Sequence, residues 1–369
     1  MKKKRDYLGF LSSLFAIVVG LLVGFLILLI SNPSQAGAGL WTILSGPLTH
    51  GMKGVGQVFY YATPIILTGL SVGFAFKTGL FNIGASGQFI VGGFAAVYVG
   101  IKCGSLGAAQ WVVALLAAVV AGMLWGAIPG IFKAFFNVNE VISCIMMNYI
   151  GMYMVNFLVS TNTSLYDKIR NYSKDVIKTA NVPKMGLDKL FAGSSINGGF
   201  IISLIVVVII YILLQKTTFG YELKAAGFNP EASKYAGMNE KRNIILSMAI
   251  AGALSALAGG LLYLAGSGKH IVIVDTLASE GFTGISVALL GLSNPIGVLL
   301  AGLFIAYITA GGFYLQLLNF STEIIDIIIA VIIYFSAFSL FVRGFILRMQ
   351  KNRSEKAATE DLAQEKGGK

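Results

Sequence analysis

Long apolar runs separated by short polar segments are the main pattern along this chain. A helix rises 1.5 Å per residue, so about 20 apolar residues cross the roughly 30 Å of hydrocarbon in a bilayer. By this criterion the sequence predicts an all-α, polytopic membrane protein with about ten transmembrane helices. The predicted spans cover residues 8–31, 57–76, 82–101, 108–132, 140–160, 199–214, 243–266, 281–293, 296–317 and 324–342.

The ends and connections of this pattern predict the domain organisation. Residues 1–342 form one transmembrane domain, and residues 343–369 form a polar tail without an apolar face. The first run is too long for a signal-peptide core, so we expect an uncleaved span, followed by a loop at SNPSQAGAG. The eighth span, 281–293, is short and rich in glycine, which leaves a re-entrant helix open as an alternative.

Composition and charge support this interpretation. The chain is 56% hydrophobic and only 12% charged, whereas soluble domains carry about 25% charged residues. A net charge of +11 would suggest nucleic acid for a soluble protein, but here the basic residues lie at the chain ends and between spans. The predicted inner segments hold 18 of the 27 Lys and Arg residues, which predicts cytoplasmic termini and no nucleic-acid partner.

Polar side chains interrupt the spans at two places, FNIGASGQF (81–89) and the span 140–160. Amides in lipid must pair inside the protein or face a cavity, so both tight helix packing and a solute path fit this pattern. In the second segment, two Asn residues eight positions apart lie about 12 Å from each other on one helix face. The candidate path residues are Asn82, Ser86, Gln88, Asn148, Tyr149 and Asn156.

The chemistry of these residues favours a small neutral solute. Amides, hydroxyls and aromatic rings suit a polyhydroxylated or heteroaromatic molecule better than an ion. The two His and two Cys residues show no metal-ligand spacing, so we expect no metal or cofactor. No catalytic motif is present, and GSGKH (266–270) does not fit the phosphate-loop pattern. The chain is therefore not expected to be an enzyme, and any ATP hydrolysis would occur in a separate subunit.

The predicted inner loop 215–242 carries the marks of a short helix. Asn229 suits an N-cap, Pro230 the first helical position and Glu231 the positive end of a helix, while Gly237 suits a left-handed cap. These signals predict a helix over 230–236. It is either a surface helix that packs on the bundle or a docking helix for a cytoplasmic partner.

Two stretches of small residues lie in blocks of opposite predicted orientation. They are FNIGASGQ in spans two to five and GFTGISVALLG in spans seven to ten. Inverted repeats leave such a pattern, with the binding path between the repeats. We therefore expect pseudo-symmetric halves.

Four segments resemble those of permeases of ATP-binding-cassette (ABC) importers for simple sugars, nucleosides and branched-chain amino acids. FNIGASGQ is similar to their FNIGxEGQ signature, and NEVISCIMMNYIGMYMVNFLV to a segment of the nucleoside branch. GYELKAAGFNPEASKYAGM resembles the coupling loop, and GFTGISVALLGLSNPIG the second-half signature. Ser86 departs from the pattern, because the family usually has Glu there. We interpret this as a diverged cargo preference or a non-equivalent partner permease.

The resemblance implies a type II ABC importer permease fold in a bacterial cell membrane. It implies three protein partners: a cytoplasmic ATP-binding subunit, a second permease copy or paralogue, and an extracellular substrate-binding lipoprotein that meets outer loops such as 161–197. It favours nucleosides as cargo. The residues that it maps onto the ATPase-coupling segment are Gly227, Asn229, Pro230, Glu231, Tyr235, Ala236 and Gly237.

Two alternatives remain open at this point. One is an ABC permease for a simple sugar. The other is a self-sufficient carrier driven by an ion gradient, with Asp326 or Glu140 as its ionisable group. A membrane scaffold has no support in the sequence.

Overall fold

The computed structural model describes residues 2–318, 320–321 and 323–331, with four isolated positions at 334, 335, 344 and 348. The side chains of residues 2–13, 16 and 230 are outside this description. The chain divides into two compact units. One comprises Met1–Gly37 with Glu323–Lys369, and the other comprises Ala38–Thr322.

The smaller unit contains α1 (Lys2–Ser31) and a helical segment over 323–331. The first predicted span is confirmed as a helix, and its described apolar part is Ile17–Ser31. A methyl group added at Gly24 would lie 3.0 Å from Ile328 Cγ2, so the two segments pack closely. The predicted span 324–342 is helical over its described part up to residue 331, and the tail 343–369 falls outside the described residues apart from Gly344 and Arg348.

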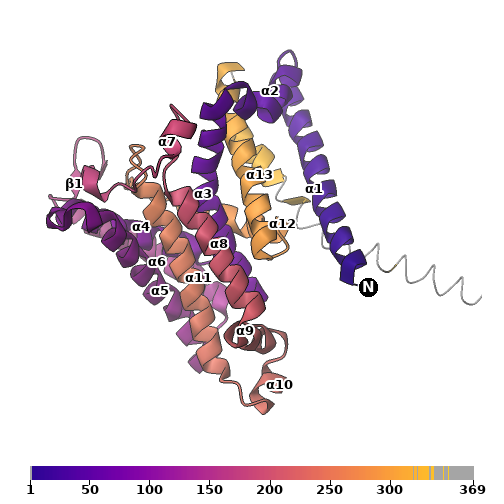
Figure 1. The fold of residues 1–369 in the computed structure, drawn as a ribbon, viewed down its shortest axis with the longest axis vertical. Coiled ribbons are helices and arrows are strands. Elements are labelled where there is room, and N and C mark those ends of the chain that lie inside the picture. The colour runs from indigo at the N-terminus through magenta and orange to yellow at the C-terminus, as the bar shows by residue number, and fades with distance from the viewer. Residues whose placement is uncertain are drawn as a thin grey trace, which may run out of the picture. The chain divides into compact units, whose positions relative to one another are not determined.

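The larger unit consists mainly of helices that pack against one another (Figure 1). The helices are α2 (Ala36–Thr49), α3 (Gly51–Lys77), α4 (Ala85–Lys102), α5 (Gln110–Phe136), α6 (Glu140–Thr161), α7 (Leu187–Leu190), α8 (Gly199–Lys216), α9 (Thr218–Phe228), α10 (Pro230–Tyr235), α11 (Glu240–Tyr263), α12 (Ser279–Leu290) and α13 (Pro295–Phe313). Three 3-10 segments are η1 (Gly104–Ala109), η2 (Lys178–Ala180) and η3 (Tyr314–Leu318).

Six helices of the described chain are long and apolar enough to cross a membrane. They are α3, α5 with η1, α6, α8, α11, and α13 with η3. The protein is therefore a multi-pass, mostly helical membrane protein. Of the other predicted spans, α4 keeps its length but is not among the six, and α12 has only 12 residues, about 18 Å.

The interior forms around α3 and α11. In the most apolar stretch of α3, 89% of the residues are buried, and in that of α11, 78% are buried. The corresponding share is only 28% in α5 and in α8. The contact between α11 and α5 depends on small residues, because a methyl group at Gly252 would lie 2.2 Å from the Gly122 carbonyl oxygen. Such close approach is typical of packing between membrane helices.

One prediction about a loop was wrong. The segment SNPSQAGAG was expected to be a loop, but α2 begins within it at Ala36 and continues through Pro47. Gly39 contacts the ring of Phe320, Gly46 the ring of Tyr314, and Ile43 lies against Gly311. Because these contacts stabilise the helix, they outweigh its low intrinsic propensity.

The segment 161–197 is not fully irregular. It contains a two-stranded antiparallel hairpin, β1 (Tyr166–Asp167) with β2 (Tyr172–Ser173), in which Tyr166 pairs with Ser173. Tyr172 also bridges to Val272, and its ring stacks on His270 with centroids 4.4 Å apart. The hairpin therefore packs against the loop that follows α11.

Candidate functional site

The polar stretch FNIGASGQF lies at a break between two helices. Helix α3 ends at Lys77 and α4 begins at Ala85. Between them Gly79 has a φ of +76°, which a residue with a Cβ rarely adopts. The chain then continues to Asn82, whose side chain is fully buried. The break brings a polar backbone turn and an amide into the interior of the unit.

Three buried amides meet at this break, and we call Asn82, Gln88 and Asn148 the amide cluster. Asn82 Nδ2 donates to Gln88 Oε1 (2.8 Å), and Gln88 Nε2 donates back to Asn82 Oδ1 (3.1 Å). Asn82 Nδ2 also donates to Ser71 Oγ (3.1 Å), which donates to the Ala251 carbonyl oxygen (2.6 Å). The cluster thus joins α3, α4 and α11 through hydrogen bonds.

Asn148 extends the cluster to α6. Its Oδ1 accepts from the Gly87 backbone N–H (2.7 Å), and its Nδ2 donates to the Ile83 carbonyl oxygen (3.0 Å). A methyl group at Gly87 would lie 2.7 Å from Asn148 Cα. The glycine therefore allows α4 and α6 to approach closely, and the amide satisfies the backbone groups of the break.

Ser86 connects the break to α12. Its Oγ donates to the Ala278 carbonyl oxygen (2.8 Å), and a methyl group at Gly281 would lie 2.4 Å from Ser86 Cα. The two small-residue stretches singled out in the sequence therefore touch each other. Ser86 is itself buried, and a Glu side chain is much larger.

The last two candidate path residues lie on other parts of α6. Tyr149 is 45% exposed and lies outside the amide cluster. Asn156 is half-buried, and its Nδ2 donates to the Val274 carbonyl oxygen (2.9 Å) in the loop after α11. The structure thus brings Asn82, Ser86, Gln88 and Asn148 together at the break and places Tyr149 and Asn156 apart from them.

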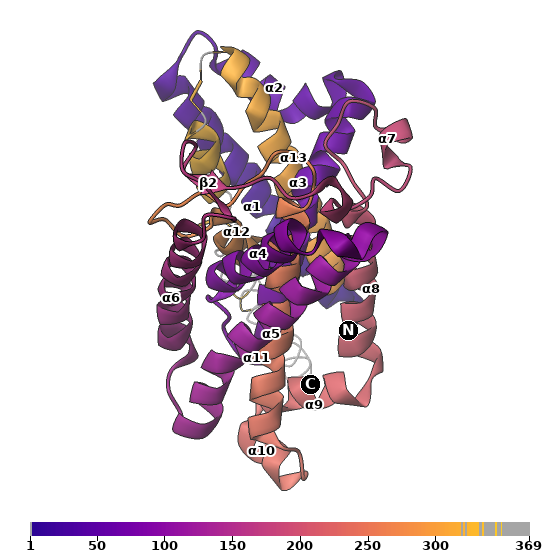
Figure 2. The same ribbon diagram turned by 90° about the vertical axis from the view of Figure 1, so that its left-hand side faces the viewer.

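Residues 227–237, which the family resemblance maps to ATPase coupling and which we call the coupling segment, fold as the sequence predicts. The helix expected over 230–236 is confirmed as α10, and Asn229 Oδ1 accepts from the Ala232 N–H (3.0 Å) as its N-cap. Gly237 has a φ of +80°, as expected of a left-handed cap. Both α9 and α10 lie at the end of the unit where α11 begins (Figures 1 and 2). Glu231, Ala236 and Tyr235 are exposed, and Tyr235 is 92% exposed.

The coupling segment touches the break directly through two glycines. A methyl group at Gly227, near the end of α9, would lie 2.4 Å from the Thr78 carbonyl carbon. One at Gly79 would lie 2.4 Å from Gly227 Cα. Backbone therefore lies on backbone here, only three residues before Asn82. The backbone of α9 thus packs directly on the turn that leads to Asn82.

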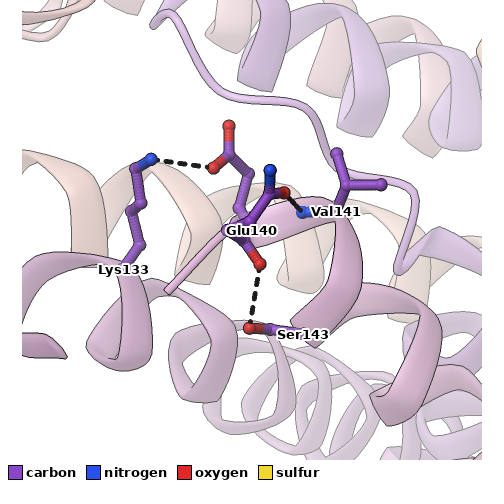
Figure 3. Close-up of polar contacts among 5 residues, drawn as sticks. Lys133, Glu140, Val141 and Ser143 are labelled. Carbon is purple, nitrogen blue, oxygen red and sulfur yellow. Dashed lines mark hydrogen bonds and ion pairs between the residues drawn. The ribbon is translucent and has the colours of Figure 1, made fainter. Parts of the chain in front are cut away.

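A cavity of about 190 Å³ lies beside this contact. Lys133, in the last turn of α5, forms an ion pair with Glu140, the first residue of α6, with Nζ and Oε2 3.1 Å apart (Figure 3). Asn139 caps α6 by accepting from the Val141 N–H (2.9 Å). Asn243 of α11 also lines the cavity, and its buried Nδ2 has no hydrogen-bond partner in the described part of the chain. A polar cavity of this size can hold water that satisfies such a group.

Sequence reasoning missed several residues that build this site. Ser71 lies within an apolar run and Asn243 at the start of a span, so neither interrupts the hydrophobic pattern. Gly79 gave a weak signal, because a single glycine between two spans is common. The helix α9 was missed because only α10 carries clear caps at both ends in the sequence.

Residues 54–337 match the family model described as "Branched-chain amino acid transport system / permease component". The chain belongs to this family. The permease is 39% identical over 355 residues to the guanosine ABC transporter permease protein NupP of Bacillus subtilis, covering 95% of this chain and 99% of that protein. It is 34% identical to the nucleoside ABC transporter permease protein NupB of Lactococcus lactis, covering 96% and 97%. It is 30% identical to the glucose ABC transporter permease protein TsgB13 of Haloferax volcanii, covering 84% and 82%. No solved structure matches the permease significantly.

Membership of this family limits what the permease does. Its relatives are permease subunits of ABC transporters, which are not enzymes themselves. The permease is therefore a membrane subunit of an ABC transport complex, which implies ATP-binding and substrate-binding partners.

Proposed function

We propose that the permease is the membrane subunit of an ATP-driven importer for nucleosides. The similarity to NupP and NupB over nearly the full length of all three chains carries this proposal. The two candidate path residues outside the amide cluster support it, since the amide of Asn156 and the exposed ring of Tyr149 suit a heteroaromatic, hydroxylated solute. The similarity to TsgB13 makes a simple sugar the second candidate cargo.

The architecture that we propose is a ten-span permease with pseudo-symmetric halves and both termini in the cytoplasm. The contact between Ser86 and Gly281 supports it, because the matching stretches of the two halves meet there. Residues 1–342 would form the transmembrane domain and 343–369 a cytoplasmic tail. The excess of Lys and Arg in the inner segments supports this orientation.

We place the solute path along α6. Tyr149 is exposed there, and Asn156 lies on the same helix, so both can face a solute. The buried residues at the break support the path indirectly, because they hold α4 against α6 and α12. These residues are Asn82, Ser86, Gln88 and Asn148. A second permease copy or a paralogue would close the path on its open side.

Coupling to ATP hydrolysis would begin at α10. Its exposed Glu231 and Tyr235 dock on the ATP-binding subunit, together with the turn at Ala236 and Gly237. Movement then passes through α9 and Gly227 to the break, where it shifts the amide cluster and the ends of α4 and α6. Outside, the hairpin in 161–197 and the loop 267–280 would meet the substrate-binding lipoprotein.

The structure offers little support for an ion-driven carrier. Glu140 pairs with Lys133 at the helix ends, and Asp326 is exposed in the smaller unit. Proteoliposomes containing the permease, its ATP-binding subunit and the lipoprotein should accumulate radiolabelled guanosine only with ATP. Accumulation by the permease alone under an ion gradient would refute the proposal, and accumulation of glucose instead of guanosine would favour the second cargo.

A further inference from the structure

A groove of about 500 Å³ lies between α5 and α11, and none of its lining residues belongs to the break or to α10. It is lined by Phe135, Asn239, Lys241, Arg242, Ile245 and Leu246. The two helices pack tightly beside it, since a methyl group at Gly130 would lie 3.1 Å from Ile245 Cα. The groove is therefore a fixed feature of two membrane-spanning helices.

Charge and apolar surface are separated along the groove. Lys241 and Arg242 lie in the first turn of α11, and Ile245 and Leu246 follow one turn later, about 6 Å further along the helix. Because α11 is a candidate span, its first turn belongs at the membrane surface and the next turn nearer the hydrocarbon. The groove is thus cationic where lipid headgroups lie and apolar where acyl chains begin.

The two cations are available to a ligand. Both side chains are exposed, and neither forms an ion pair within the residues that the structure describes. Lys241 Nζ lies 4.7 Å from the centroid of the Phe135 ring, which keeps the ammonium group at the groove. Glu240 lines the separate cavity beside Lys133 and is not among the residues that line the groove.

We propose that this groove binds one anionic phospholipid. Two cations attract a headgroup phosphate, and clusters of Lys and Arg beside a membrane helix select anionic lipids. Phe135, Ile245 and Leu246 give the acyl chains an apolar wall. A soluble phosphate would gain no binding free energy from that wall, and a neutral lipid would gain none from the cations. The lipid would fix the ends of α5 and α11, close to the coupling segment.

Native mass spectrometry of the full chain in mild detergent tests this proposal. The probes are phosphatidylglycerol and phosphatidylcholine with identical acyl chains. We expect phosphatidylglycerol to bind more tightly, and the double substitution Lys241→Gln with Arg242→Gln to weaken its binding on the order of tenfold to thirtyfold. Binding of phosphatidylcholine should not change. Phe135→Ala should weaken both lipids and preserve the preference between them.

Matched controls show whether the lost binding comes from this groove or from a general loss of positive charge. The pair Lys216→Gln with Lys224→Gln removes the same charge from α8 and α9, outside the groove, and should leave lipid binding unchanged. Glycerol phosphate at the same concentrations should not compete. Equal phosphatidylglycerol affinity in wild type and the groove double variant would overturn the proposal, as would effective competition by glycerol phosphate. Unchanged lipid binding with loss of the ATP-binding subunit would identify the surface as a protein interface instead.

Discussion

The amide cluster and helix α10 are stabilised in opposite ways. Asn82 and Gln88 are at most 1% exposed and satisfy each other inside the protein. Helix α10 is capped at both ends, by Asn229 and by the left-handed Gly237, while Tyr235 is 92% exposed. The cluster depends on hydrogen bonds between distant segments, whereas the caps of α10 come from adjacent residues.

This difference suggests a division of labour. Buried polar networks that are fully satisfied specify one arrangement, because any other leaves costly unpaired groups. A helix that is capped at both ends and exposes side chains such as Tyr235 can bind a partner with little reorganisation. The contact of Gly227 with Gly79 joins the two regions. Substitutions in each region should therefore differ in what they damage.

The largest loss of stability is expected from a substitution at the contact between Gly227 and Gly79. In Gly227→Ala the new methyl group would lie 2.4 Å from the Thr78 carbonyl carbon, so backbone must move. Overpacking typically costs about 1 to 3 kcal/mol of unfolding free energy, and a clash with backbone belongs at the upper end of this range or above it. Thermal unfolding in mild detergent and uptake in proteoliposomes measure the effect, and both should fall. The control Gly37→Ala adds a methyl group to a helix where nothing lies within 4 Å, so it should leave stability unchanged or raise it slightly through the higher helix propensity of Ala. Equal stability of the two variants would contradict the proposed contact.

The amide cluster should respond next most strongly. Asn82→Ala leaves both polar ends of the Gln88 side chain without the partner that Asn82 provides. Buried groups left in this way cost about 2 to 4 kcal/mol together. The double variant Asn82→Leu with Gln88→Met removes both partners and should recover most of that loss, because no unpaired amide remains. If the double variant is less stable than Asn82→Ala, Asn82 and Gln88 do not satisfy each other's hydrogen bonds.

A smaller effect is expected at the N-cap of α10. Asn229→Ala removes the acceptor for the Ala232 N–H and should cost the helix about 1 kcal/mol. Hydrogen exchange of the α10 amides should speed up, whereas the amides of α3 and α4 should keep their protection. Asn229→Ser supplies another good N-cap and should restore slow exchange. Faster exchange in α4 would show that α10 also supports the interior.

The two regions also differ in how well the sequence predicts them. All the signals for α10 lie within Asn229 to Gly237, so local rules suffice. The sequence identifies the amides of the cluster as groups that are costly to place in lipid. It does not identify the groups with which they form hydrogen bonds. Asn148 lies 61 residues from the Gly87 N–H that it binds, and Ser71 lies 180 residues from Ala251. Such pairings depend on tertiary packing, which hydrophobic periodicity does not specify.

The same limit explains the errors in the fold. Residues of α2 include several glycines and a proline, so local propensity favours a loop. Contacts with Tyr314 and Gly311, more than 250 residues away, make it a helix. Six of the predicted spans correspond to long apolar helices of the described chain, because span length follows directly from bilayer thickness, whereas α4 and α12 are not among the six. The family motifs added what periodicity could not, namely that the chain is an ABC transporter permease.

The smallest change in stability should accompany a severe loss of function. Glu231 is exposed on α10, so Glu231→Gln should leave the unfolding free energy and membrane abundance unchanged. If α10 docks on the ATP-binding subunit, uptake should nevertheless fall to background, because the docking contact loses its charge. The corresponding exchange Asp326→Asn, which neutralises an exposed carboxylate in the smaller unit, is the control and should preserve uptake. Co-purification of the ATP-binding subunit reports the contact directly. Normal co-purification and ATPase activity with Glu231→Gln would show that α10 is only a surface helix, and the division of labour between the two regions would no longer hold.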